Sequence, residues 1–186
     1  MERFVVLSGC SGGGKSTLLA ELGRRGHAVV EEPGRRIVAE ETLATGRALP
    51  WIDMAAFARR AVEVARRDRV LARAMPRPGY VFFDRGLIDA AAALDHSCGQ
   101  AACGAALRAV AARRYNRQVF LTPPWPQIYA SDEARRHGLD EAIAEYERLL
   151  KAYGALGYEP VVLPRVPVGQ RADFVLRHLV ARTDGV

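Results

Sequence analysis

Eight residues near the start of the sequence, Gly-Cys-Ser-Gly-Gly-Gly-Lys-Ser at positions 9–16, fit the pattern G-x-x-x-x-G-K-[ST] of a phosphate-binding loop, the P-loop. An apolar, β-branched run precedes them and an amphipathic pattern follows, so the loop joins a strand to a helix. Backbone N–H groups that no side chain shields approach phosphate oxygens closely, at the positive end of the helix dipole. We expect this stretch to bind phosphates through Gly9, Ser11, Gly12, Gly13, Gly14, Lys15, Ser16 and Thr17.

Three side chains of the stretch have separate expected roles. Lys15 is placed to bridge the β and γ phosphates as a point charge. Ser16 offers its hydroxyl to Mg²⁺, and Thr17 is expected to reach the α phosphate. The predicted ligands are therefore ATP and Mg²⁺; the sequence Asn-Arg-Gln at 116–118 lacks a guanine-reading NKxD motif, which favours ATP over GTP.

Acidic residues follow two other apolar runs. Glu31 and Glu32 follow one of them, and Asp84 follows another. Because ligands of open parallel sheets gather at the carboxyl ends of the strands, these carboxylates should surround the γ phosphate. Asp84 is the expected carboxylate for Mg²⁺, either directly or through water. The alternative is that Asp84 only caps the helix that follows it.

These residues need a scaffold of alternating strands and helices, and the sequence predicts one. Five continuously apolar runs, at 3–8, 28–32, 80–84, 118–122 and 160–164, indicate strands buried on both faces. Helical patterns lie at 15–26, 53–74, 87–94, 101–113, 139–155 and 169–182, the second with Asp53 as N-cap and an apolar stripe that includes Leu71. The prediction is an α/β fold: a three-layer α/β/α P-loop NTPase with a five-stranded parallel sheet and a helical lid.

Composition indicates one globular domain over residues 1–186, with 49% hydrophobic and 26% charged residues. The net charge of +6 is spread over arginine pairs rather than a basic run, which disfavours nucleic acid as a partner. Three cysteines without CxxC spacing predict reduced thiols, and the sequence shows no transmembrane segment. The predicted location is the cytoplasm.

Two further segments carry a resemblance to known families. "EEPGRRIVAEE" at 31–41 resembles the Glu-Pro segment of deoxynucleoside and thymidylate kinases, and "FFDRGLID" at 82–89 resembles their Asp-Arg motif. With "FLTPPWPQIYASDEARRHG" at 120–138 and "VVLPRVPVGQRADFVL" at 161–176, the chain looks most similar to the NadR-like AAA domain family, which includes ribosylnicotinamide kinase domains. The resemblance spans almost the whole chain.

The resemblance implies roles around the phosphates. Glu32 is expected as general base or as ligand of the acceptor hydroxyl, and Asp84 competes with it for the base role. Arg85 is expected to steady either an acceptor phosphate or a carboxylate. Arg35 and Arg36 are candidates for binding an anionic acceptor, or else an exposed pair on a helix.

The resemblance also implies a lid at 122–138, in which Arg135 and Arg136 would cover the γ phosphate as it develops charge. Arg171 follows the last strand, and by resemblance it would cover the adenine ring. Trp125, inside the lid-like segment, is a candidate for stacking on an acceptor ring, whereas Trp51 is expected to anchor the core.

Together these features predict an enzyme, an ATP-dependent phosphotransferase that passes the γ phosphate to a hydroxyl of a small molecule such as a nucleoside or ribosylnicotinamide. The alternative is a nucleotide-binding ATPase or GTPase switch of the NadR-like AAA family that has no small-molecule acceptor. Acceptor-stimulated release of ADP separates the two.

Overall fold

The computed structural model describes residues 3–44, 46–75, 79–99, 104–112, 115–129 and 138–180. Its centre is a five-stranded sheet in the order β2-β3-β1-β4-β5, in which every neighbouring pair is parallel. The strands are β1 (Phe4–Gly9), β2 (Ala28–Val30), β3 (Val81–Asp84), β4 (Gln118–Thr122) and β5 (Glu159–Val162). The predicted five-stranded parallel sheet is confirmed.

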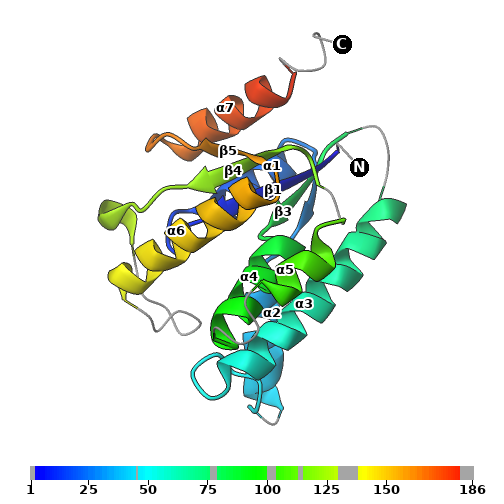
Figure 1. Ribbon diagram of the computed structural model, residues 1–186. Helices are drawn as coiled ribbons and strands as arrows, with labels where there is room; N and C mark the ends of the chain where they lie inside the picture. Colours follow the sequence, from blue (N-terminus) through cyan, green and yellow to red (C-terminus); the bar gives the residue numbers. More distant parts are fainter. Residues whose placement is uncertain are drawn as a thin grey trace.

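Helices cover both faces of this sheet (Figure 1). One face packs against α1 (Lys15–Arg24) and α7 (Val168–Val180) in an apolar cluster that includes Leu7, Leu18 and Val175. The other face packs against α3 (Met54–Leu71), α4 (Leu87–Ser97) and α6 (Leu139–Ala155), and α2 (Pro33–Leu43) and α5 (Ala105–Val110) add to that second cluster. The three central strands, β1, β3 and β4, are buried almost throughout, as their continuous apolarity predicts, whereas the edge strands β2 and β5 are partly exposed.

Element ends differ from the sequence-based expectation where a single residue dictates the backbone. Strand β2 stops at Val30 rather than at residue 32, because Pro33 occupies the first turn of α2 and Glu32 is its N-cap. Pro160 is tolerated inside β5 because this strand lies at the edge of the sheet. Helix α5 is shorter than 101–113 and follows Gly104, whose φ is 71°; residues 100–103 and 113–114 lie outside the described ranges.

Helix α3 confirms one prediction and overturns another. Asp53 is its N-cap, and the carboxylate accepts a hydrogen bond from the Ala56 N–H at 2.8 Å. The expected apolar stripe is wrong at its C-terminal end, since Leu71 is 56% exposed. The last turns of α3 instead bury Asp68 and Arg69. Trp51, expected in the core, is also exposed.

The predicted lid, 122–138, begins where β4 ends. The described part of this segment holds a 3₁₀ turn at Pro126–Ile128. Helix α6 begins at Leu139, directly after the segment ends. Among the described residues, none of the helices combines the length and apolarity needed to cross a membrane.

Candidate active site

The P-loop joins β1 to α1, as the sequence predicted, and its shape depends on glycine. Gly9, Gly12 and Gly14 have φ values of 102°, 77° and 79°, which side chains rarely adopt. A Cβ on Gly9 would lie 2.4 Å from the carbonyl oxygen of Thr122, on β4. The loop is therefore pressed against the neighbouring strand, where the Cys10 amide donates to the Thr122 carbonyl at 2.9 Å.

Lys15 is the first residue of α1 and is buried. Its ammonium group donates to the carbonyl oxygen of Cys10 at 2.9 Å, inside the P-loop. Burial lowers the pKa of Lys15, and the nearby charge of Arg85 lowers it further. An arriving polyphosphate would stabilise this buried cation further.

Ser16 and Asp84 meet across the ends of β1 and β3. The Ser16 hydroxyl donates to Oδ2 of Asp84 at 2.8 Å, and Asp84 is 1% exposed. Within the described residues, the second oxygen of Asp84, Oδ1, is buried without a hydrogen-bond partner. Burial raises the pKa of Asp84 to about 6, and the charge of Glu32 adds to this rise.

This pair fits a magnesium ion. A hydroxyl and one carboxylate are hard oxygen ligands, and Mg²⁺ takes its remaining ligands from water and phosphates. The described residues hold no group of three or more His, Cys, Asp or Glu side chains arranged for a metal, so the ion would depend on its nucleotide. An unpaired buried carboxylate oxygen is otherwise unfavourable, and a bound cation would satisfy it.

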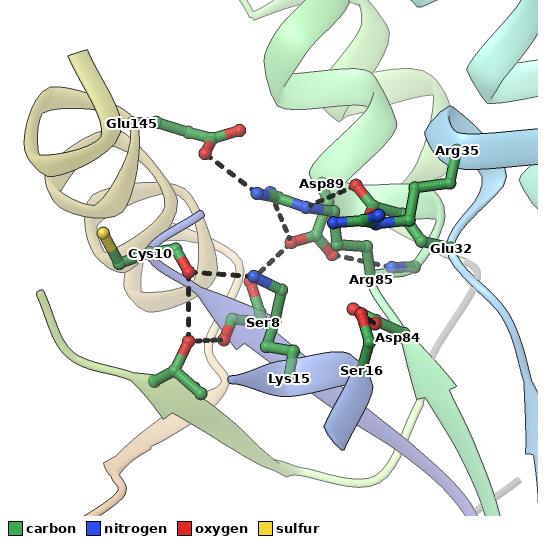
Figure 2. A network of polar contacts seen from close by, with 12 residues as sticks. Ser8, Cys10, Lys15, Ser16, Glu32, Arg35, Asp84, Arg85, Asp89 and Glu145 are labelled. Atoms are coloured by element: carbon green, nitrogen blue, oxygen red, sulfur yellow. Dashed lines mark hydrogen bonds and ion pairs between the residues drawn. The ribbon is translucent and has the colours of Figure 1, made fainter. Parts of the chain in front are cut away.

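Arg85, the residue after Asp84, lies at the centre of a second group of polar contacts (Figure 2). It occupies the turn between β3 and α4 with a φ of 61°, and its amide donates to the Leu7 carbonyl at 2.9 Å. Its guanidinium contacts three carboxylates at the end of the sheet: Glu145 at 2.8 Å, Glu32 at 3.2 Å and Asp89 at 3.9 Å. Burial disfavours the cation, but the Glu145, Glu32 and Asp89 charges outweigh it and raise the pKa of Arg85.

Asp89 is a buried member of this group that the sequence analysis did not single out. Its carboxylate accepts hydrogen bonds from the Ser8 hydroxyl, from the Tyr153 hydroxyl at 2.5 Å and from the Gly86 amide at 2.8 Å. Burial and the Asp89 charge raise the pKa of Tyr153 well above its ordinary value, so its hydroxyl stays a donor. Asp89 therefore ties β1, α4 and α6 together under Arg85.

Glu145 was also missed. It lies on α6, sixty residues beyond Arg85, and nothing in the residues around it resembles a motif. Asp89 had a signal, since it is an acidic residue in the first turn of the helix that follows the Asp-Arg pair. Glu145 had none, because its position depends on how α6 crosses the sheet.

A cavity of about 180 Å³ opens beside these carboxylates. Glu32, Arg35, Arg85, Asp89 and Glu145 line its polar end, together with Ser11 of the P-loop. Its remaining lining, mostly apolar, consists of Pro33, Gly34, Val38, Pro50, Met54, Phe57, Ala61, Gly86, Ala90 and Ala93. The site thus has a phosphate loop and, directly beside it, room for a second small ligand.

The two arginines of α2 have different surroundings. Arg35 lines the cavity and contacts Glu32 at 3.4 Å. Arg36 lines a different hollow and donates to Asp68 on α3 at 3.2 Å. The structure therefore brings Arg35 to the candidate site and leaves Arg36 outside it.

Arg171 touches the P-loop from α7. Its guanidinium donates to the carbonyls of Gly13 and Gly14 at 3.2 and 3.3 Å and lies 5.6 Å from the centre of the Trp125 ring. Trp125 accordingly sits on the P-loop side and does not line the cavity beside Glu32. The predicted contact of Arg171 with adenine stays a prediction, and the predicted lid residues Arg135 and Arg136 lie outside the described residues.

A family model described as an AAA domain matches residues 4–171. No curated protein sequence matches the chain.

Among solved structures, the NadR protein in complex with NAD and AMP-PNP superposes with a TM-score of 0.68 at 20% identity, covering 100% of this chain and 50% of that chain. Deoxyadenosine kinase from M. mycoides with bound dATP gives 0.65 at 15% identity, with coverages of 95% and 98%. Shikimate kinase from Acinetobacter baumannii in complex with shikimate gives 0.59 at 17% identity, with coverages of 97% and 94%. These likenesses show a P-loop kinase-like fold and confirm the expected similarity to NadR.

Proposed function

The chain belongs to the AAA domain family, and we propose that it is an ATP-dependent phosphotransferase that moves the γ-phosphoryl group to a hydroxyl of a small molecule, such as a nucleoside or ribosylnicotinamide. One observation carries the proposal: the cavity lined by Glu32, Arg85 and Asp89 opens beside the P-loop. A site of this kind places a second ligand next to the terminal phosphate, as phosphoryl transfer requires. We propose that residues 1–186 act as one unit.

In the proposed mechanism, P-loop amides and Lys15 hold the β and γ phosphates. Ser16 and Asp84 would hold Mg²⁺, which neutralises phosphate charge when it is bound. Glu32 lies at the N-cap of α2, where it contacts Arg85 at 3.2 Å and lines the cavity. We assign it as the acceptor of the hydroxyl proton, since Asp84 already contacts Ser16 at 2.8 Å.

The proposed transfer exchanges one oxygen on the γ phosphorus for another. The acceptor oxygen forms a bond to the γ phosphorus while the bond from that phosphorus to the β–γ bridging oxygen breaks, and the hydroxyl proton passes to Glu32. The products are ADP and a phosphate monoester. Arg171 supports the reaction from behind the P-loop, and the lid arginines Arg135 and Arg136 are proposed to cover the γ phosphate.

The three cysteines lack CxxC spacing, which favours reduced thiols in a reducing compartment, so we propose a cytoplasmic protein. ATP rather than GTP is the proposed donor, because the sequence has no guanine-reading NKxD motif.

The test is a screen for acceptor-dependent ADP release with nucleosides, ribosylnicotinamide and small alcohols. An active acceptor should raise turnover in the wild type, while Lys15→Ala and Asp84→Asn should each reduce it by about a hundredfold or more. If the protein hydrolyses ATP at one rate whatever the acceptor, the proposal is wrong and a nucleotide switch is the better account.

A further inference from the structure

The guanidinium of Arg85 is enclosed by carboxylates. Glu145 on α6, Glu32 at the start of α2 and Asp89 on α4 contact it from three elements, at 2.8, 3.2 and 3.9 Å. Its side chain is 12% exposed. Figure 2 shows these carboxylates around the guanidinium. An arginine in these surroundings is already charge-balanced before any acceptor arrives.

The charged lining of the cavity is negative overall. Among the described residues that line it, three carboxylates (Glu32, Asp89 and Glu145) face two guanidinium groups (Arg35 and Arg85). Arg35 is itself 3.4 Å from Glu32, so both cations contact carboxylates of the same site. An anionic group entering this end of the cavity would lose its water and meet like charge, which is unfavourable.

The rest of the cavity wall suits an uncharged ring. Phe57 and Ala61 of α3 and Val38 of α2 belong to this apolar lining. A ligand that fits both parts has a hydroxyl at the polar end and an apolar or aromatic body.

We propose that Glu145 is a specificity-determining residue that keeps Arg85 from binding anions, so that the site takes uncharged or cationic alcohols with an apolar or aromatic ring and rejects phosphorylated or carboxylated ones. This rests on the proposed function, because it treats the cavity as the acceptor site. Glu145 is 30% exposed at its side chain, and it can be changed without opening the core.

The test uses matched pairs of probes that differ in one negative charge centre: nucleosides against their 5′-monophosphates, and methyl shikimate against shikimate. Calorimetry measures their binding to the protein loaded with AMP-PNP and Mg²⁺, and ADP release with ATP is measured in parallel. The variants are Glu145→Gln, which removes the charge and keeps the shape of the side chain, and Glu145→Ala, which truncates the side chain and so removes the carboxylate. Glu147→Gln, at an exposed position of the same helix, is the control.

The wild type is expected to bind the neutral member of at least one pair about tenfold or more tightly than its anionic partner. Glu145→Gln should reduce that preference about tenfold by tightening the binding of the anionic probe, because Arg85 could then make a charge-assisted contact with the anion. Glu147→Gln should leave the preference unchanged.

Equal or tighter binding of the anionic probes by the wild type, an unchanged preference in both Glu145 variants, or no binding of any probe would overturn the inference. If binding discriminates by charge while no probe stimulates ADP release, the selectivity stands and the proposed phosphotransfer fails. The two claims therefore fail separately.

Discussion

At the residue scale, the carboxylate of Asp84 lies in surroundings that disfavour its charge. It is buried with one oxygen bonded to Ser16, and within the described residues its other oxygen has no partner. Burial and the neighbouring Glu32 disfavour its charge, so the folded protein holds this carboxylate at a cost in stability. Such a cost is common where a group is kept for ligand binding rather than for folding.

Asp84→Asn is therefore expected to stabilise the unliganded protein while it reduces turnover by about a hundredfold or more. The folded pKa, about 6, lies above the ordinary value of 3.8, so ionisation of Asp84 lowers stability as the pH rises from about 4 to 6. The difference in unfolding free energy between variant and wild type should grow over this pH range and level off above it, at about 3 kcal/mol. Urea unfolding of both proteins from pH 4 to 8 measures it; a variant less stable than the wild type at pH 7 would contradict the account.

Residue-scale prediction from sequence was uneven for a physical reason. Asp84 and Glu32 were identifiable because each stands at the end of an apolar run. The carboxyl ends of parallel strands lie at the same edge of the sheet, where ligands bind. Glu145 was not, because a helix residue far along the chain joins a site through tertiary packing alone.

At the element scale, the P-loop depends on β4 behind it. Gly9 and Gly26 both have positive φ values, 102° and 89°, but a Cβ on Gly9 would meet Thr122 at 2.4 Å whereas one on Gly26 would meet nothing within 4 Å. Gly26→Ala should cost about 1 kcal/mol of stability from backbone strain alone. Gly9→Ala should cost about 3 kcal/mol or more, because strain and a backbone clash add. Thermal unfolding compares the pair, and equal losses would argue against the close packing of loop and strand.

Helix α7 supports the same loop through Arg171, whose guanidinium contacts the carbonyls of Gly13 and Gly14. Arg171→Met should weaken binding of AMP-PNP about tenfold, since the loop carbonyls lose a charged donor. Arg177→Met, at an exposed position of α7, is the control and should bind like the wild type. Calorimetry decides, and unaltered affinity in Arg171→Met would show that the loop holds its shape without α7.

Elements themselves were largely predictable. The alternation of apolar strands and amphipathic helices specifies a parallel sheet covered on both faces, and the Asp53 cap fixes where α3 starts. Strand and helix ends set by local chemistry, such as Pro33 after β2, were harder to place. The exposure of Leu71 could not be foreseen, because the helical period alone does not show that the last turns of α3 bury Asp68 and Arg69 instead.

At the scale of the whole molecule, the proposed site is assembled from elements that lie far apart in the sequence, from Ser11 to Glu145. The P-loop comes from β1, the cavity from α2, α3 and α4, and one carboxylate from α6. A ligand that binds across these elements should stabilise the fold as a unit.

AMP-PNP with Mg²⁺ at about a hundred times its dissociation constant should stabilise the protein by about 2.7 kcal/mol, which corresponds to a rise in melting temperature of about 5–10 °C. Lys15→Ala should melt without this nucleotide-dependent rise. EDTA should reduce the rise in the wild type, because without the ion nothing offsets the repulsion between the Asp84 carboxylate and the phosphates. A rise of the same size in Lys15→Ala would count against the assigned phosphate site.

The central claim is that phosphate passes from ATP to a hydroxyl held beside Glu32. The most direct measurement follows the label of γ-³²P-ATP during incubation with nucleosides, ribosylnicotinamide and ring alcohols, with Glu32→Gln as the matched variant. The account predicts label in a phosphate monoester with the wild type and about a hundredfold less with Glu32→Gln. Label appearing solely as inorganic phosphate, at a rate that no acceptor changes, would contradict it.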